Sequence, residues 1–81
     1  MLFIATVYSH FGAIHYRREC EKKKLSARMS PVPRALSSSC GTCVLVEAGS
    51  YSDLPAPTEE VEQIAGETPD GYHFYYQAEK D

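Results

Sequence analysis

Two cysteines separated by two residues, Cys40 and Cys43, are the side chains of this sequence best suited to chemistry. Thiols at this spacing can form a small-loop disulfide, share a soft metal ion, or let one thiol resolve an adduct carried by the other. The residues between and before them, Gly41-Thr42 and Ser37-Ser38-Ser39, are small and polar. We therefore expect the sulfur atoms to be reachable from solvent, and the functional interpretation depends mainly on this turn.

Cys40 is the candidate nucleophile, because nearby cations and exposed backbone N–H groups favour a thiolate. Arg34 lies six residues upstream, and Ser39 and Gly41 can turn their N–H groups toward the sulfur as an anion nest. His10 is a candidate acid or base near the thiol. The structural alternatives are an unreactive turn residue for Cys40, a surface ion pair for Arg34 and a solvated first-turn ring for His10.

The other cysteines have stronger structural explanations. Cys43 begins an apolar segment, so it is either a resolving thiol for Cys40 or a small buried hydrophobe. Cys20 falls in a predicted helix, where packing in the core is its expected role. A structural zinc ion needs four nitrogen or sulfur ligands, and the sequence has one Cys-x-x-Cys pair and three scattered histidines. We predict no metal ligands and no cofactor, although a dimer would pool two such pairs.

The composition predicts a single domain of 81 residues, with 43% hydrophobic and 23% charged residues. A net charge of −3 argues against nucleic acid as the main partner. The basic residues Arg17, Arg18, Lys22–Lys24 and Arg28 are expected on the solvated face of a helix, with a binding patch as the alternative. No segment predicts a membrane span or a signal peptide, so we expect a cytoplasmic protein with reduced thiols.

Apolar periodicity, β-branched content and turn residues predict six elements in the order strand, helix, strand, strand, helix, strand. They are expected at residues 2–8, 10–24, 25–31, 43–48, from 58 onward, and 72–76. Ser9 and Thr58 can cap the two helices, and Val61, Ile64 and Ala65 supply the apolar stripe of the second helix. The polar segment 35–41 is expected to be a loop or one helical turn.

This order is that of the split βαβ plan of ferredoxin-like α+β domains. It predicts a βαββαβ fold with a four-stranded antiparallel sheet, two helices on one face, and a right-handed crossover through the first helix. Residues 77–81 are expected to be a frayed tail. The aromatic strand at 72–76 is expected to pack in the sheet, with a partner or dimer surface as the alternative.

The segment Pro31-Val32-Pro33-Arg34, followed by Ser37-Ser38-Ser39-Cys40-Gly41, resembles the family of selenium/sulfur carrier-like proteins. In that family a strand and a Ser-containing step lead into a helix, and a Pro-Val-Pro-Arg segment precedes a Ser-Ser-Cys-Gly turn. Here the match covers about residues 3–47, with Tyr8-Ser9-His10 at the first step. The resemblance implies that Cys40 holds a persulfide or selenide. The position of Cys43 is commonly apolar in the family, so a second thiol departs from the pattern.

We therefore expect a thiol carrier or accessory protein in sulfur or selenium handling rather than a stand-alone enzyme. Cys40 would carry the chalcogen and Cys43 would resolve or protect it, with Arg34, Ser39, Gly41 and His10 as substrate-binding residues. The expected partners are protein donor and acceptor enzymes, for example a cysteine desulfurase and a selenium-using enzyme, and a homodimer stays open. A thiol-based metal- or ligand-binding module and a non-catalytic interaction domain are the alternatives.

Overall fold

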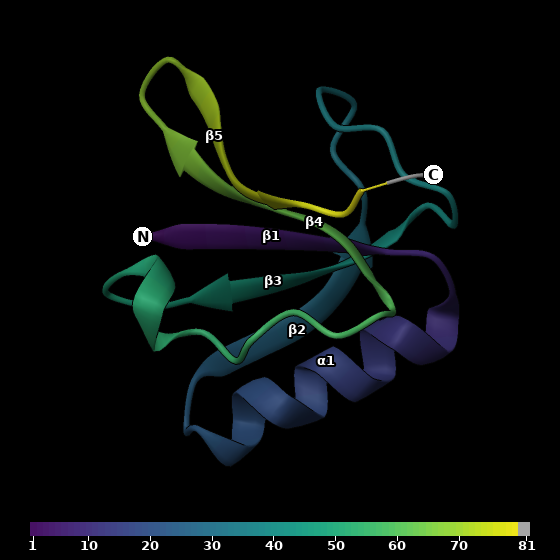
Figure 1. Ribbon diagram of the computed structural model, residues 1–81. Coiled ribbons are helices and arrows are strands. Elements are labelled where there is room, and N and C mark those ends of the chain that lie inside the picture. Colours follow the sequence, from purple (N-terminus) through teal and green to yellow (C-terminus); the bar gives the residue numbers. More distant parts are fainter. Residues whose placement is uncertain (80–81) are drawn as a thin grey trace.

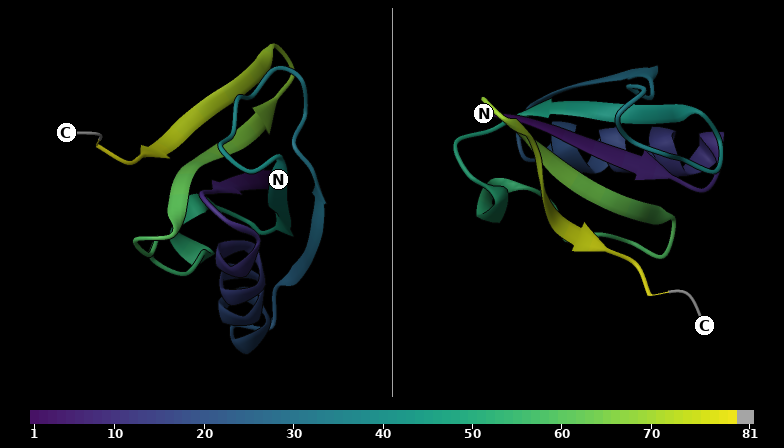
Figure 2. Two further views of the ribbon diagram at one scale, coloured as in Figure 1. Left: turned by 90° about the vertical axis from the view of Figure 1, so that its right-hand side faces the viewer. Right: turned by 90° about the horizontal axis from the view of Figure 1, so that it is seen from above.

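Residues 1–79 are described by a computed structural model as five β-strands, one α-helix and a short 3₁₀ helix. The elements are β1 (Leu2–Val7), α1 (His10–Lys22), β2 (Ser26–Pro31), β3 (Thr42–Glu47), η1 (Tyr51–Asp53), β4 (Val61–Thr68) and β5 (Gly71–Gln77) (Figure 1). The strands form one sheet in the order β2-β3-β1-β4-β5, and every neighbouring pair is antiparallel. α1 lies along one face of the sheet, and the connection between β2 and β3 rises on the other side (Figures 1 and 2).

The first four predicted elements are confirmed. β1, α1, β2 and β3 each begin and end within two residues of the predicted bounds, and β5 extends the predicted last strand by one residue at each end. The capping prediction for Ser9 is also confirmed, because its hydroxyl accepts a hydrogen bond from the Gly12 N–H at 3.2 Å. These elements could be predicted because each has its own local signal in the sequence.

The predicted ferredoxin-like fold, with four strands and two helices, is wrong because the second helix does not form. The Glu60 N–H donates to the Thr58 hydroxyl at 3.2 Å in a turn, and Val61 then begins β4. Val61 and Ile64 are three residues apart, which is a helical spacing. Both still reach the same core from a strand, because β4 carries a β-bulge between them.

The connection between β3 and β4 covers part of the face on which the second helix was expected. Leu54 in this connection is buried against the helix side of the sheet, and the carbonyl of Pro55 accepts a hydrogen bond from the Tyr16 hydroxyl at 2.9 Å. The helix-side core contains Phe3, Ala5, Val7, Ala13, Tyr16, Cys20, Val44, Val46, Leu54, Val61 and Ile64. An irregular segment therefore supplies apolar cover beside α1.

A second, smaller core lies on the opposite face of the sheet. Successive strand residues point to opposite faces, so Phe3, Ala5 and Val7 of β1 face α1 while Ile4 faces the other way. Ile4 packs there with Leu36, Cys43 and Ala65. Leu36 comes from the β2–β3 connection, so this connection is held against the sheet by a buried side chain.

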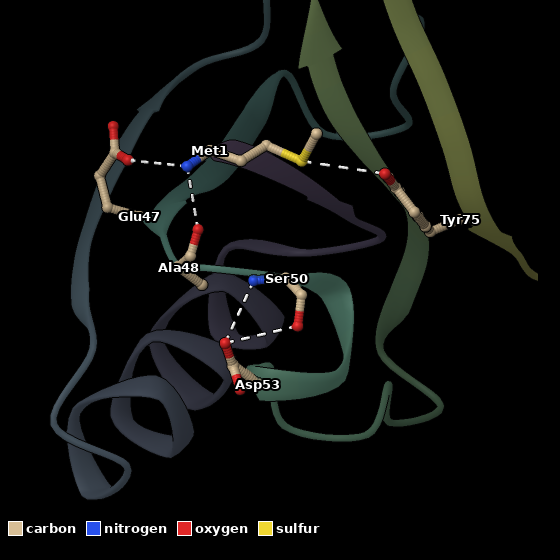
Figure 3. A network of polar contacts seen from close by, with 6 residues as sticks. All are labelled: Met1, Glu47, Ala48, Ser50, Asp53 and Tyr75. Carbon is tan, nitrogen blue, oxygen red and sulfur yellow. Dashed lines mark hydrogen bonds and ion pairs between the residues drawn. The ribbon is translucent and has the colours of Figure 1, made fainter.

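The beginning of β1 is fixed by polar contacts at the end of the sheet away from that connection (Figure 3). The Met1 amino group donates to the Ala48 carbonyl at 2.9 Å and lies 3.7 Å from the Glu47 carboxylate. The Tyr75 hydroxyl lies 3.8 Å from the Met1 sulfur. Beside them the Asp53 carboxylate accepts from the N–H of Ser50 at 3.1 Å and caps η1.

β5 is an edge strand whose aromatic side chains are partly exposed. Phe74 is 44% and Tyr75 is 37% exposed, so the expectation of a partner or dimer surface stays a prediction. Of the predicted tail at 77–81, Gln77 ends β5, and the Ala78 N–H donates to the Glu62 carbonyl at 2.9 Å. Residues 80–81 lie outside the described residues.

Candidate functional site

Residues 32–41, here called the thiol loop, connect β2 to β3 and contain Cys40. The loop is closed at its base by a hydrogen bond from the Val32 N–H to the Gly41 carbonyl at 3.1 Å. A turn follows Pro33, whose carbonyl accepts from the Leu36 N–H at 3.0 Å. The buried Leu36 side chain then packs on the sheet. Both ends and the middle of the loop are thereby fixed.

Gly41 adopts a left-handed backbone conformation, with a φ of +74°. A Cβ atom placed on it would meet no heavy atom within 4 Å, so conformation rather than space requires glycine at this position. The turn at Gly41 directs the chain from Cys40 into β3, which begins at Thr42. The predicted role of Gly41 beside Cys40 is thus explained by chain geometry, while its expected role as an N–H donor to sulfur stays a prediction.

The β-bulge of β4 places two successive polar side chains beneath the thiol loop. Thr6 of β1 pairs with Gln63, and the next residue, Val7, pairs with Val61, which leaves Glu62 as the extra residue. Because a bulge interrupts the alternation of faces, Glu62 and Gln63 both make hydrogen bonds to the loop. Neither residue was predicted as part of the site.

Glu62 binds the residue that precedes the thiol. Its carboxylate accepts from the Ser39 hydroxyl at 2.8 Å and from the Ser39 N–H at 3.3 Å. It also accepts from the hydroxyl of Thr6, a fully buried residue of β1, at 3.3 Å. Hydrogen bonds to an ionised acceptor are stronger than neutral ones. Glu62 therefore links a central strand to the backbone next to Cys40.

Two further contacts hold the segment before Cys40. The Gln63 side-chain amide donates to the Ser37 carbonyl at 2.9 Å. The Ser38 hydroxyl donates to the carbonyl of Val7, the last residue of β1, at 3.5 Å and accepts from the Cys40 N–H at 3.4 Å. The three serines thus contact three different residues of the sheet, and the hydroxyls of Ser38 and Ser39 make contacts that a residue without a hydroxyl could not.

Cys40 is a half-buried free thiol. It packs against the helix-side core, and its sulfur donates to the Thr42 carbonyl at 3.5 Å. Leu36 packs against the opposite core. The thiol loop therefore crosses from one face of the sheet to the other beside the end of β1, and Cys40 lies on the side of α1.

Cys43 is fully buried in the core on the opposite face from α1. Its sulfur donates to the Pro31 carbonyl at 3.7 Å, and both Cys40 and Cys43 are free thiols. Burial first, and then the neighbouring Cys40, raises the pKa of the Cys43 thiol to about 11. Cys43 therefore remains protonated near neutral pH.

Cys20 is also fully buried, which confirms the predicted packing role of this residue in α1. Burial, followed by the charges of Glu19 and Glu21, raises the pKa of its thiol to about 11. Residues 1–79 include all three cysteines, and Cys40 is the one whose side chain reaches solvent.

Within residues 1–79, no hydrogen bond or ion pair joins the predicted binding residues Arg34 and His10 to Cys40. Both side chains are exposed, and within residues 1–79 neither makes a hydrogen bond or an ion pair. Ser39, in contrast, lies in the site, although its contacts are made with Glu62 rather than with sulfur. The geometry supports a role for Ser39 in fixing the loop and leaves the roles of Arg34 and His10 as predictions.

A small hollow lies beside the thiol loop. A pocket of about 180 Å³ is lined by Ser37, Glu62, Gln63, Gln77 and Ala78, and Cys40 is not part of its lining.

Among the described residues, no group of three or more His, Cys, Asp or Glu side chains is arranged to hold a metal ion. The helix of residues 10–22 is too short and polar to span a bilayer, and the described chain contains no helix that is suited to it.

Glu62 and Gln63 are absent from the predicted site because the spacing of Val61, Ile64 and Ala65 predicts a helix there. Their site role depends on the pairing of β1 with β4, which joins residues far apart in the chain. The available signal was the polar pair itself, which interrupts an otherwise apolar run from Val61 to Ala65. A strand with two adjacent polar residues at its start is compatible with a bulge.

Comparison with known proteins identifies the family. The family model described as "Putative Se/S carrier protein-like" matches residues 2–76, and the chain therefore belongs to this family. The resemblance drawn from the Pro-Val-Pro-Arg segment and the Ser-Ser-Ser-Cys-Gly turn is thereby confirmed. No curated protein and no solved structure matches the chain significantly.

Proposed function

We propose that this protein carries sulfur or selenium as a persulfide or its selenium analogue on Cys40. The observation that carries the proposal is the difference among the three thiols: Cys40 is half-buried in a well-held loop, whereas Cys20 and Cys43 are fully buried. A carrier needs one thiol that partner enzymes can reach and that does not react elsewhere in the fold. Membership of a carrier-like family supports the same role.

The proposed transfer is an exchange between sulfur atoms. The Cys40 thiolate attacks the outer sulfur of a persulfide on the donor enzyme, a new S–S bond forms, and the donor's own sulfur leaves as a thiolate. In the second step a nucleophile of the acceptor attacks the outer sulfur on Cys40, and the Cys40 thiolate leaves. The proton of the Cys40 thiol passes to solvent when the thiolate forms. No other oxidant or reductant is required.

The partners of this cycle are proteins, with a cysteine desulfurase as the donor type and a sulfur- or selenium-using enzyme as the acceptor type. The protein is then an accessory carrier without turnover of its own. The cytoplasm is the compartment this chemistry favours, because a persulfide carrier requires thiols that are kept reduced. We assign Cys43 to packing in the resting state, since resolving a persulfide would require it to leave the core on the opposite face from α1.

The test is the intact mass of the protein after incubation with a cysteine desulfurase and cysteine. Wild-type protein is expected to gain the mass of one sulfur atom, and Cys40→Ser is expected to gain none. Cys43→Ala, which removes the buried thiol, is expected to gain sulfur as wild type does. A gain that persists in Cys40→Ser, or no gain in wild type, would refute the proposal. Selenocysteine supplied in place of cysteine tests the selenium form, because the desulfurase then presents selenium at the same oxidation level as the outer sulfur of its persulfide.

A further inference from the structure

Glu62 is the extra residue of the β-bulge in β4. In a regular strand the side chains of Glu62 and Gln63 would point to opposite faces of the sheet. The bulge leaves Glu62 unpaired with β1, and the side chains of both Glu62 and Gln63 make hydrogen bonds to the thiol loop. Bulges are common beside functional sites, where they redirect a side chain.

The contacts of Glu62 connect a rigid element to the backbone beside the reactive thiol. Thr6 lies in the central strand β1 and is fully buried. Ser39 is exposed and directly precedes Cys40. One carboxylate accepts hydrogen bonds from both, including two from Ser39. Loss of this carboxylate would free Ser39 from the sheet while the turn at Gly41 and the packing of Leu36 remain.

We propose that Glu62 is a positioning residue for Cys40. By binding Ser39, it holds the Cys40 sulfur half-buried against the helix-side core, and release of Ser39 presents the sulfur to a partner. The contact thereby protects a bound sulfur atom from small thiols between donor and acceptor. The carrier role in this inference rests on the proposed function of Cys40, whereas the positioning of the thiol rests on the geometry alone.

The test is the rate at which iodoacetamide alkylates Cys40 in the folded protein, read by mass spectrometry of the peptide that contains it. Glu62→Ala is expected to raise the rate by about tenfold, the factor that corresponds to the loss of one charge-assisted hydrogen bond. Glu60→Ala is the matched control, because Glu60 lies two residues away and its carboxylate binds His15 rather than the loop. This control is expected to react at the wild-type rate.

A double-mutant cycle separates positioning from general loosening of the fold. If Glu62 acts through Ser39, then Ser39→Ala also raises the alkylation rate, and the double variant reacts no faster than Glu62→Ala alone. Glu62→Gln keeps one carbonyl oxygen as an acceptor and is expected to react at an intermediate rate. Rate increases that multiply in the double variant, or a wild-type rate in folded Glu62→Ala, would overturn the inference.

The outcome can be told apart from that of the carrier proposal, because alkylation needs no sulfur donor. Faster alkylation of Glu62→Ala in a protein that never accepts sulfur would support positioning and refute the carrier role. An unchanged alkylation rate of Glu62→Ala, in a protein that does accept sulfur, would support the carrier role and refute positioning. If Glu62→Ala does not fold, Ser39→Ala decides the question, since it changes an exposed side chain: a wild-type rate would overturn the inference.

Discussion

At the scale of single residues, the three cysteines differ in what surrounds them rather than in type. Cys40 is half-buried in a loop, while Cys20 and Cys43 are fully buried in separate cores. The rise in pKa of the two buried thiols from 9.0 to about 11 lowers their thiolate fractions about 100-fold at neutral pH. Because the thiolate is the reactive form, burial and the raised pKa values both make Cys20 and Cys43 poor nucleophiles in the folded protein.

This difference predicts the order of alkylation. At pH 8 in the folded protein, Cys40 is expected to react with iodoacetamide at least about 100 times faster than Cys20 or Cys43, because the buried thiols are protonated and enclosed. Peptide mapping at successive times measures the three rates. In denaturant the three rates should converge, which serves as the control. Early modification of either buried cysteine in folded protein would contradict the assignment.

A second prediction concerns Gly41. Gly41→Ala is expected to lower the free energy of unfolding by about 1 kcal/mol, because alanine must adopt a positive φ without any new contact. Gly41→Asn should lower it less, since asparagine tolerates this conformation better. Urea unfolding of the three proteins measures the difference. Equal stability of the alanine and glycine forms would show that the turn relaxes without cost.

Part of the site could be predicted at this scale and part could not. Cys40, Ser39 and Gly41 form a local motif, so residue types and spacing were enough to select them. Glu62 could not be selected in this way, because its role arises from a bulge in the pairing of β1 with β4. Arg34 was chosen for its charge and its distance along the chain, but the loop leaves its side chain in solvent.

At the scale of elements, the amino-terminal half of the fold could be predicted and the carboxy-terminal half only in part. The segments of β1, α1, β2 and β3 each carry their own periodicity or capping signal. β4 does not, because its bulge gives Val61 and Ile64 the spacing of a helix. Its identity as a strand is fixed by pairing with β1 on one side and β5 on the other.

The packing of β4 against β5 predicts a requirement for glycine at position 66. A Cβ atom on Gly66 would lie 2.7 Å from Cε2 of Tyr75, and that ring is stacked on Tyr51 with centroids 5.0 Å apart. Gly66→Ala is therefore expected to lower the free energy of unfolding by about 1–3 kcal/mol. Urea unfolding checks this value. In a Tyr75→Ala background the same change should cost clearly less, and an equal cost there would contradict the explanation.

At the scale of the whole molecule, the sheet separates two hydrophobic cores that are covered by different segments. α1 and the β3–β4 connection pack on one face, and the thiol loop holds a smaller core on the other (Figures 1 and 2). The cores bury ionisable groups in neutral form, since burial raises the pKa values of Cys20, Cys43 and Tyr16. The free energy of unfolding should therefore decrease at alkaline pH.

The sign of that dependence follows from the two protonation states. Above pH 9 the cysteines of the unfolded chain lose protons that the folded protein retains up to about pH 11. The free energy of unfolding should therefore fall as pH rises through this window, by about 2 kcal/mol for each buried thiol. Urea unfolding between pH 7 and 11 measures the slope. Cys43→Ala should show a shallower slope, and an unchanged slope would contradict the prediction.

The most direct test of the account is the location of transferred sulfur in the wild-type chain. After incubation with a cysteine desulfurase and cysteine, the protein is alkylated, digested without reductant and mapped by mass spectrometry. We predict an alkylated persulfide on the peptide containing Cys40. The peptides containing Cys20 and Cys43 should carry no added sulfur atom. Sulfur on either buried cysteine in folded protein, or on none of the three, would contradict the account.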